Sequence, residues 1–509
     1  MLPVVTAAEM RALDQDTIKN VGISGFTLME TAGRAVAEVA AAMLETSTQG
    51  AERRRVAVVC GPGNNGGDGY VVARVLRARG IDAVVYLAVN REAVQGQARA
   101  HLDVLERSSG VVHMIDTPEA FEPHREDIAA AALVVDAVFG TGLVRPIVDH
   151  LASVVHAINA AAVRLAIDVP SGLDSDTGRT LGVAVDAHRT VTMGPHKVAL
   201  VSAPGFARCG EVTLAEIGIP RALIDASPIH AGLVEPADVE GWLPRATALD
   251  HKGRRGHVLV VGGGPGMRGA GRLAATAALR AGAGLVTLAA AAGAADELAA
   301  ADAVMTRALH DRADLATALA GKAAVVIGPG LGTHDPARAW VTDILASGIP
   351  AVLDADALNL FAGSPETLRG AAGPVVITPH PGEAARMLGI TIAEVEADRL
   401  AAARALAGQT RAIVVLKGAR TIVCDGTLGD DHCSINPTGG PALATGGSGD
   451  VLGGAIAALL AQGLAPADAA RVGVYVHGRA GDELARVHGA RGVISSDLPI
   501  AIAAVMAAL

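Results

Sequence analysis

Short runs of β-branched and other apolar residues recur along the chain, and most are followed by a turn rich in Gly or Asp and then by an Ala- and Leu-rich stretch. This alternation predicts strands that alternate with helices, which is typical of a parallel sheet with helices on both faces. In the first half the predicted strands are 55–60, 83–89, 133–137 and 163–167. In the second half they are 257–261, 323–327, 351–353, 375–378 and 413–416.

The rhythm of strands is interrupted between about residues 219 and 244, where Pro220, Pro228, Pro236 and Pro244 stand. The length of 509 residues also exceeds what one ordinary hydrophobic core supports. We therefore predict two domains, 1–220 and 241–509, joined by a linker at 221–240. The halves share no obvious sequence repeat, so we expect two different α/β domains rather than a duplication.

Composition narrows the class of protein further. Hydrophobic residues make up 51% of the chain and charged residues 18%, which excludes general disorder. A net charge of -10 argues against a nucleic-acid partner. Residues 1–20 combine charged and apolar positions as an amphipathic helix does, and not as a signal peptide does. The apolar run 451–465 is interrupted by glycines and Gln462, so it predicts a buried helix and no membrane contact.

The cysteines indicate a compartment. Cys60, Cys209, Cys424 and Cys433 show neither the close pairing of a zinc site nor the density of a disulfide framework. We therefore expect a cytoplasmic protein.

In the first half, Gly-Pro-Gly-Asn-Asn-Gly-Gly-Asp-Gly occupies 61–69, between a predicted strand and a helix expected to start near Tyr70. Backbone N–H groups at a helix N-terminus favour phosphate, although a lone glycine-rich loop is about as often a plain tight turn. Two more loops, 136–142 and 168–174, follow strands at the same sheet edge, which favours a ligand site there. Asn65, Asp136 and Ser171 offer oxygen ligands that suit a hard cation and not zinc.

In the second half, Ala-Thr-Gly-Gly-Ser-Gly-Asp occupies 444–450 and leads directly into a helix from Val451. Glycine amides at a helix start can stabilise a transferring phosphoryl group, and Asp450 can accept the proton of an attacking hydroxyl. The alternative is a glycine N-cap with an acidic residue matched to the helix dipole, which leaves the density of glycine unexplained. We interpret the turn as an anion hole beside a general base.

Two further loops follow strands in this half, Thr-Pro-His-Pro-Gly-Glu at 378–383 and Leu-Lys-Gly-Ala-Arg-Thr at 416–421. We expect Glu383 to orient Mg²⁺ through water, and the loop that begins at Lys417 to hold the phosphate or sugar of a nucleotide. A Walker A motif is missing from the sequence, so a different nucleotide-binding fold is required. The glycines at 262–266 favour close approach of a second ligand, but Pro265 departs from the dinucleotide fingerprint.

Together, the motifs at 61–69, 168–174 (Asp-Val-Pro-Ser-Gly-Leu-Asp), 378–383 and 444–450 resemble the family of bifunctional NAD(P)H-hydrate repair enzymes over nearly the whole chain. The resemblance implies a Rossmann-like three-layer α/β domain followed by a ribokinase-like α/β domain. It implies that the first domain interconverts the R and S epimers of hydrated NADH and NADPH (NADHX and NADPHX). The second domain would dehydrate the S form at the expense of ADP, giving AMP and phosphate.

The same resemblance implies residue roles. The epimerase pocket would be lined by Asn64, Asn65, Gly66, Gly67, Asp68, Gly140, Thr141, Gly142, Leu143, Val144, Arg145, Pro146 and Asp168. Potassium would be bound by Asn65, Asp136 and Ser171. The hydrated cofactor in the dehydratase would face Ala270, Gly330, His380 and Asp450. The adenine nucleotide would be held by Lys417, Gly418, Ala419, Arg420, Thr421, Gly446, Gly447 and Gly449.

The expected chemistry uses the lone pair of the nicotinamide nitrogen. Phosphorylation turns the ring hydroxyl into a good leaving group, with Asp450 as the base; in the first domain Asp168 is the candidate acid and base. Two other functions stay open: a small-molecule kinase of the vitamin-precursor type, and a nucleotide-sensing scaffold without turnover. The residues do not distinguish ADP from ATP, although the resemblance favours ADP, and a homo-oligomer is expected.

Overall fold

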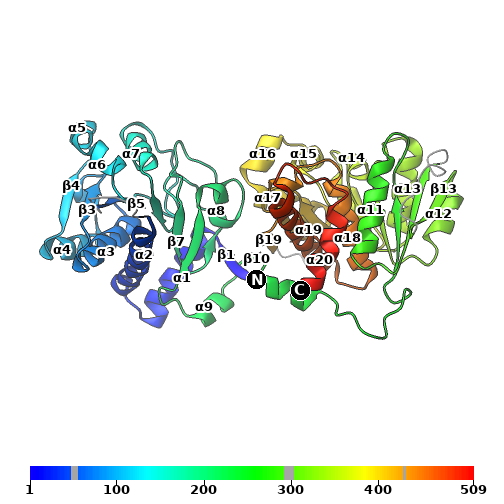
Figure 1. The fold of residues 1–509 in the computed structure, drawn as a ribbon, viewed down its shortest axis with the longest axis horizontal. Coiled ribbons are helices and arrows are strands. Elements are labelled where there is room, and N and C mark those ends of the chain that lie inside the picture. The colour runs from blue at the N-terminus through cyan, green and yellow to red at the C-terminus, as the bar shows by residue number, and fades with distance from the viewer. Residues whose placement is uncertain (48–54, 292–302, 428–431) are drawn as a thin grey trace. The chain divides into compact units, whose positions relative to one another are not determined.

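The computed structural model describes residues 1–47, 55–291, 303–427 and 432–509 (Figure 1). Contacts divide the chain into two compact units, Leu2–Ile229 and His230–Leu509, with Met1 in the second. The division falls inside the segment 221–240 that we expected as a linker. That segment contains helix α9 (Arg221–Ala226) and strand β10 (Ala231–Leu233), and helix α10 (Pro236–Trp242) begins in it.

The N-terminal unit is built on a seven-stranded parallel sheet in the order β4-β3-β2-β5-β6-β7-β9. Its strands are β2 (Val56–Cys60), β3 (Ala83–Leu87), β4 (Val111–Met114), β5 (Leu133–Ala137), β6 (Arg164–Ile167), β7 (Arg189–Met193) and β9 (Glu211–Ala215). The four strands predicted for this half are confirmed as β2, β3, β5 and β6. The strands β4, β7 and β9 were not predicted.

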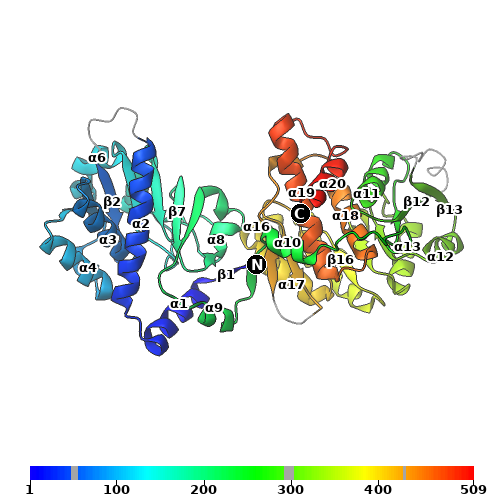
Figure 2. The same cartoon turned by 60° about the horizontal axis from the view of Figure 1, so that its bottom comes forward.

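Helices cover both faces of this sheet, and successive residues of a strand therefore pack into two separate cores. Val58 packs in a core with α2 and α3, whereas its neighbour Val59 packs in a core with α7. The helices of the unit are α1 (Ala7–Asp16), α2 (Gly25–Ser47), α3 (Asn64–Ala78), α4 (Gly96–Arg107), α5 (Pro118–Phe121), α6 (Arg125–Ala129), α7 (Asp149–Ala160) and α8 (Val198–Val201), besides α9. Figure 2 shows α2, in dark blue, lying along one face. The expected three-layer α/β domain is confirmed.

The N-terminal segment differs from the single helix expected over 1–20. Strand β1 (Leu2–Val5) pairs in parallel with β8 (His196–Lys197), and only then does α1 begin. The helix begins at Ala7 because Thr6 and Glu9 form a capping box. A π-helical segment, Thr17–Val21, follows α1.

The C-terminal unit has a mixed sheet in the order β13-β12-β11-β14-β15-β16-β17-β18-β19-β10. Its strands are β11 (His257–Val261), β12 (Leu285–Ala291), β13 (Met305–Leu309), β14 (Ala324–Ile327), β15 (Ala351–Leu353), β16 (Val375–Ile377), β17 (Ile413–Leu416), β18 (Ile422–Asp425) and β19 (Cys433–Ile435), besides β10. The pairings are parallel from β13 to β17, and β18 is antiparallel to both neighbours. All five predicted strands of this half are confirmed.

One large core joins a face of this sheet to α11, α18, α19 and α20. The helices of the unit are α10, α11 (Arg268–Arg280), α12 (Arg312–Leu319), α13 (Asp335–Ala346), α14 (Asp356–Asn359), α15 (Pro381–Leu388), α16 (Ile392–Ala397), α17 (Arg399–Thr410), α18 (Ser448–Ala461), α19 (Pro466–His488) and α20 (Leu498–Ala508). Helix α18 is buried along almost its whole length, which confirms the expectation for the apolar run. Among the described residues, every helix is too short or too polar to cross a bilayer.

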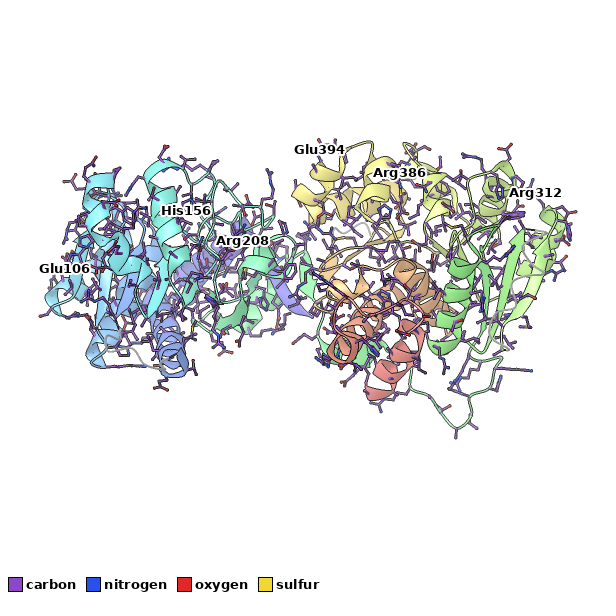
Figure 3. The ribbon with its side chains drawn as sticks, turned by 45° about the horizontal axis from the view of Figure 1, so that its top comes forward. Glu106, His156, Arg208, Arg312, Arg386 and Glu394 are labelled. Atoms are coloured by element: carbon purple, nitrogen blue, oxygen red, sulfur yellow. A yellow bond between two sulfur atoms is a disulfide. The ribbon has the colours of Figure 1, made fainter. Side chains whose placement is uncertain are left out.

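Charged side chains such as Arg312, Arg386 and Glu394 lie exposed at the surface (Figure 3). The cysteines behave differently from our expectation, because Cys424 and Cys433 form a disulfide between the paired strands β18 and β19. Their spacing in the sequence gave no sign of it. The thiols of Cys60 and Cys209 are buried.

Candidate active sites

The first site lies where the order of the N-terminal sheet reverses, between β2 and β5. Loops that follow such neighbouring strands diverge, and open α/β sheets bind ligands in the crevice between them. The two loops are in close contact at their start. A Cβ atom on Gly61 would lie 1.9 Å from the carbonyl oxygen of Val138, so only glycine fits there.

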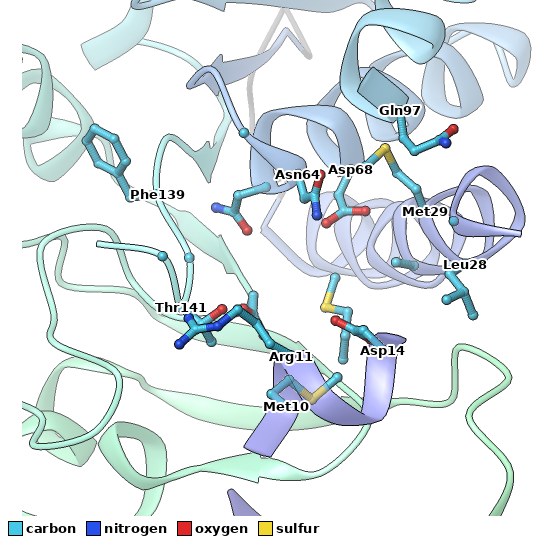
Figure 4. Close-up of a pocket in the computed structure, with 18 of the residues that line it drawn as sticks. Met10, Arg11, Asp14, Leu28, Met29, Asn64, Asp68, Gln97, Phe139 and Thr141 are labelled. Carbon is cyan, nitrogen blue, oxygen red and sulfur yellow. The ribbon is translucent and has the colours of Figure 1, made fainter. Parts of the chain in front are cut away.

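A cavity of about 510 Å³ opens at this point, a size typical of small-molecule sites. Of the residues predicted for the epimerase pocket, it is lined by Asn64, Asn65, Asp68, Gly140, Thr141, Gly142, Leu143 and Asp168. Helices α1 and α2 complete the wall with Met10, Arg11, Asp14, Leu28 and Met29, which the sequence motifs did not include (Figure 4). Gly66, Gly67 and Val144 are not part of this wall, and Arg145 and Pro146 line a smaller neighbouring hollow.

The glycines of the 61–69 motif mainly permit close packing. Helix α3 begins at Asn64, not near Tyr70 as expected, so the later glycines lie within the helix. A Cβ atom on Gly66 would lie 2.1 Å from the Gly61 carbonyl oxygen, and one on Gly67 would lie 2.4 Å from the Met29 sulfur. These glycines bring α3 against the loop and α2, and thereby place Asn64, Asn65 and Asp68 at the cavity.

Asp168 occupies the end of β6 in a left-handed backbone conformation, with φ of 65°. Such a conformation is uncommon for a non-glycine residue and is often found at functional sites. Its Oδ1 lies 2.7 Å from the Nζ of Lys197 and accepts a hydrogen bond of 3.1 Å from the Thr192 hydroxyl. Lys197 is almost fully buried and also donates to the Thr192 hydroxyl and to the Met193 carbonyl. The ammonium group thus has three acceptors for its three hydrogens.

Three carboxylates share the charge of Lys197. Burial is the main reason why the pKa of Asp14 rises to about 6, with Lys197 opposing the shift and Asp168 adding to it. Burial and the repulsion of Asp168 and Asp14 also raise the pKa of Asp68 well above its ordinary value. Groups with shifted pKa values in a cleft are candidates for proton transfer. Sequence reasoning missed Lys197 and Asp14; a lysine just before the apolar run 198–201 was the one signal available.

Of the residues predicted to bind potassium, Asn65 lines this cavity, whereas Asp136 and Ser171 are buried and do not. Asp136 is completely buried, and its oxygens accept bonds from the Ser171 amide at 2.8 Å and hydroxyl at 2.6 Å. Burial raises the pKa of Asp136 to about 6 against the effect of these bonds. A Cβ atom on Gly140 would lie 3.1 Å from the Asn65 Oδ1 and 3.0 Å from the Asp168 Oδ2, so Asn65 lies beside Gly140 and Asp168.

The second site is the turn before α18. The helix begins at Ser448 after Gly447, whose φ of 88° is the left-handed conformation that glycine adopts readily. A Cβ atom on Gly447 would lie 2.5 Å from the Leu273 side chain of α11. Ser495 donates to the Gly446 carbonyl, and the Ser448 hydroxyl lies 3.2 Å from the Nε2 of buried His477. The turn is therefore held from several sides, which is what a preorganised anion hole requires.

Beside this turn lies a buried ion pair. The Nζ of Lys417 is 2.6 Å from the Oδ1 of Asp354, which is 1% exposed and also accepts a bond from the Thr378 hydroxyl. A Cβ atom on Gly449 would lie 3.2 Å from the Lys417 Nζ, so the pair is adjacent to the anion hole. Sequence reasoning missed Asp354, although its position directly after a predicted strand was the signal that identified the other loops.

Asp450 lies in the first turn of α18 and is half-buried. Burial, with repulsion from Asp354 and Asp356 and against the attraction of Lys417, raises the pKa of Asp450 to about 7. A carboxylate with a pKa near the working pH suits general base catalysis. The burial of Lys417 alone would lower the pKa of its ammonium, but Asp354 and Glu383 raise it overall, so Lys417 stays charged.

The hydrogen bonds of His380 and Glu383 show which ring nitrogen of His380 carries the proton and which atoms the Glu383 carboxylate contacts. The Nδ1 of His380 accepts hydrogen bonds from the backbone of Gly382 and Glu383, so the proton of the neutral ring lies on Nε2. Burial and the charge of Lys417 lower the pKa of His380, which keeps the ring neutral. One oxygen of buried Glu383 caps α15 by accepting from the His380 amide at 2.8 Å. Its other oxygen lies 3.4 Å from the His380 ring.

The loops after β11 and β14 meet at the switch point of the second sheet. The amides of Gly263 and Gly264 donate to the carbonyls of Pro329 and Gly330, each at 2.8 Å. A Cβ atom on Gly330 would lie 3.3 Å from the Cβ of Ala270, so these two predicted residues are neighbours. Ala270 is on α11, which packs closely on α18. The predicted substrate-facing residues Ala270 and Gly330 thus belong to the region that borders the anion hole.

The loop 417–421 is supported from below by Arg399, another residue that sequence reasoning missed. Arg399 is buried, and its Nη2 donates to the Lys417 carbonyl at 3.1 Å. A Cβ atom on Gly418 would lie 2.8 Å from this nitrogen, and Gly418 has a left-handed φ of 135°. Arg420 donates to the Pro437 carbonyl and Thr421 to the Gly418 carbonyl. Gly418 and Ala419 remain exposed at the tip of the loop.

Two family models match the chain. The model described as NAD(P)H-hydrate dehydratase matches residues 258–503, and the model described as YjeF-related protein N-terminus matches residues 25–199. The first matched range contains the Asp450 turn, and the second contains Asp168 with the loops 61–69 and 136–142.

Curated proteins match over almost their full length. The chain is 44% identical to the bifunctional NAD(P)H-hydrate repair enzyme of Moorella thermoacetica, covering 97% of this chain and 95% of that protein. It is 35% identical to the enzyme of the same name from Escherichia coli, covering 97% and 92%. Among solved structures, the ADP/ATP-dependent NAD(P)H-hydrate dehydratase of Bacillus subtilis is 29% identical, with a TM-score of 0.48, covering 54% of this chain and 96% of that one.

Proposed function

Because the chain belongs to the family of bifunctional NAD(P)H-hydrate repair enzymes, we propose that its two sites restore hydrated NADH and NADPH in sequence. The N-terminal site interconverts the two epimers of the hydrate. The C-terminal site removes the hydroxyl from the S epimer and regenerates the reduced cofactor. The observation that supports this proposal most strongly is the half-buried Asp450 in a held glycine turn beside the Lys417–Asp354 pair.

The dehydratase reaction begins with transfer of a phosphoryl group to the ring hydroxyl. The Asp450 carboxylate accepts the hydroxyl proton, and the amides between Gly446 and Gly449 stabilise the charge on the phosphoryl group as it moves. The ring nitrogen then expels phosphate, the neighbouring ring carbon loses a proton, and the double bond returns. The ring of neutral His380, whose Nε2 lies 3.4 Å from a Glu383 oxygen, is the group proposed to orient the nicotinamide, with Ala270 and Gly330 also facing the substrate.

The nucleotide is expected over the loop 417–421, where Lys417 supplies a fixed positive charge and Gly418 and Ala419 allow close approach. ADP is the proposed donor, and it leaves as AMP. Glu383 is the one side chain proposed for Mg²⁺. One of its oxygens caps α15, and the other would contact the ion through a metal-bound water. When bound, Mg²⁺ would screen the phosphate charges of the donor.

The epimerase reaction uses the push of the same nitrogen without a nucleotide. An acid protonates the hydroxyl, water leaves, and water returns on the other face of the ring. Asp168 is the proposed acid and base, because it reaches the cavity and is oriented by Lys197 and Thr192. Asn64, Asp68 and the turn 140–143 contact the substrate.

Potassium is proposed beside the epimerase cavity. The donor set fits, since Asn65, Asp136 and Ser171 present amide, carboxylate and hydroxyl oxygens, and Asp136 is a fully buried carboxylate. Potassium bound there would neutralise the Asp136 charge and fix the loops that carry Phe139 and Ser171. A cytoplasmic location and a homo-oligomer complete the proposal.

A vitamin-precursor kinase would use the same Asp450 turn, and a nucleotide sensor would bind without turnover. One assay separates the three functions: the protein is mixed with hydrated NADH and either ADP or ATP, and absorbance and phosphate release are followed. The proposal predicts return of the reduced-nicotinamide absorbance with one phosphate per cofactor. A phosphorylated product that accumulates would indicate a kinase, and binding without phosphate release would indicate a sensor.

A further inference from the structure

The epimerase cavity contains a carboxylate that none of the sequence motifs includes. Asp14 lies on α1, upstream of residues 25–199 that the family model matches. It lines the same cavity as Asp68, Asp168 and Lys197. Figure 4 shows the side chains of Asp14, from α1, and Asp68, from α3, directed into this space.

Epimerisation by loss and return of water needs proton transfer on both faces of the ring. On one face a proton is added to the departing hydroxyl while the carbon–oxygen bond breaks and the nitrogen lone pair forms a carbon–nitrogen double bond. On the other face a water oxygen adds to the same carbon and loses a proton. A single carboxyl group would have to serve both oxygens in turn, whereas two groups on different walls can serve one oxygen each.

We propose that Asp14 is the second catalytic residue of the epimerase site and transfers protons on the ring face opposite Asp168. This inference rests on the proposed epimerase function. In each turnover one carboxyl group gives a proton to the leaving hydroxyl, and the other carboxylate takes one from the entering water. The pair therefore carries one proton before and after the reaction, and atoms and charge balance without a further reactant.

The surroundings of the two carboxylates favour this division. Asp168 is held by the ammonium of Lys197 and the hydroxyl of Thr192. Within the part of the chain that the structure describes, the Asp14 carboxylate accepts no hydrogen bond. The charged groups near it are Lys197, Asp168 and Asp68, besides Arg11 on the cavity wall. Burial raises its pKa to about 6, so Asp14 holds a proton more readily than an ordinary aspartate does.

The test compares full-length Asp14→Asn with Asp16→Asn, a carboxylate on the same helix that bonds to Asn20 and does not line the cavity. Interconversion of the two hydrate epimers is followed by chiral separation without nucleotide. We expect Asp14→Asn to lose about 10²-fold or more in kcat, and Asp16→Asn to match wild type. Dehydration of the S epimer with ADP is the internal control for the amount of intact C-terminal unit, and it should be unchanged in both variants; the circular dichroism melting curve of each variant checks the fold of the N-terminal unit.

The pH profile distinguishes catalysis from a structural role. In the wild type the epimerase rate should fall above about pH 6, where Asp14 loses its proton. Asp14→Asn should lack this fall. Asp14→Glu should recover part of the rate and part of this alkaline limb of the pH profile. An Asp14→Asn variant with the wild-type rate and the same limb would overturn the inference. Failure of the wild type itself to interconvert the epimers would instead refute the proposed epimerase function.

Discussion

Replacing Asp450 by Asn should slow dehydration strongly and at the same time stabilise the C-terminal unit above neutral pH. Burial, reinforced by repulsion from Asp354, raises the pKa of Asp450 from 3.8 to about 7. The unfolded chain keeps the ordinary value, so the folded state is penalised for carrying the ionised carboxylate. A shift of about three units corresponds to about 4 kcal/mol at 1.36 kcal/mol per unit, which is the upper limit of the expected gain.

The stability that Asp450→Asn gains over the wild type depends on pH. Below about pH 4 the carboxyl is protonated in both states and makes no difference between them. Between about pH 4 and 7 the unfolded state ionises while the folded state keeps its proton, so wild-type stability falls as the pH rises. Asparagine has no charge to bury, and the advantage of Asp450→Asn therefore grows across this window and is constant above it.

Urea unfolding followed by tryptophan fluorescence measures this effect in the full chain, because both tryptophans, Trp242 and Trp340, lie in the C-terminal unit. The comparison is made at about pH 4 and about pH 8.5, with Asp335→Asn, an exposed carboxylate on α13, as the control. Dehydration by Asp450→Asn should fall about 10²-fold or more. Equal stability of Asp450→Asn and wild type at the higher pH, or near-normal dehydration by the variant, would refute the reasoning.

Three further changes test other parts of the sites. Lys417→Met leaves buried Asp354 without its partner, so urea unfolding should show a loss of about 3–5 kcal/mol in the free energy of unfolding. Because Lys417 lowers the pKa of Asp450, its removal should also move the acid limb of the pH profile of dehydration to higher pH. Gly454→Ala places a Cβ atom 2.1 Å from a carbonyl oxygen of α11 and should cost about 1–3 kcal/mol, whereas Gly453→Ala, with ordinary contacts, should not. Asp168→Asn should slow epimer interconversion by about 10²-fold in chiral separation; an unchanged rate would remove it from the chemistry.

The sequence predicted the framework well because the signal was local. All nine expected strands exist, and each is a buried apolar run followed by a turn. Some of the missed strands lack this signal: β4 is half-exposed, and β18 and β19 form a short antiparallel pair after the last predicted strand. Others, such as β7 and β12, are buried runs that we overlooked. The segment 2–5 was taken as helix because its hydrophobic residues are followed directly by the charged positions of α1.

The site residues also divide into those that a local sequence pattern identified and those that it did not. Asp168 in the first site and Lys417 in the second were identified because each directly follows a predicted strand, and Asp450 was identified from the glycine-rich start of α18. Lys197 and Asp14 reach the cavity from β8 and α1, and this proximity depends on tertiary packing that has no local pattern. The packing role of Gly67 was also hidden, since a Cβ atom there would meet Met29, which is distant in the sequence.

The most direct test of the account follows the oxygen atom of the hydroxyl that is removed. S-configured NADHX is prepared with the heavy isotope of oxygen at its ring hydroxyl, and the protein is supplied with ADP and Mg²⁺. If Asp450 and the glycine turn phosphorylate that hydroxyl before it leaves, the released phosphate carries the label, one atom per reduced cofactor formed. Label found in water, with unlabelled phosphate, would contradict the account.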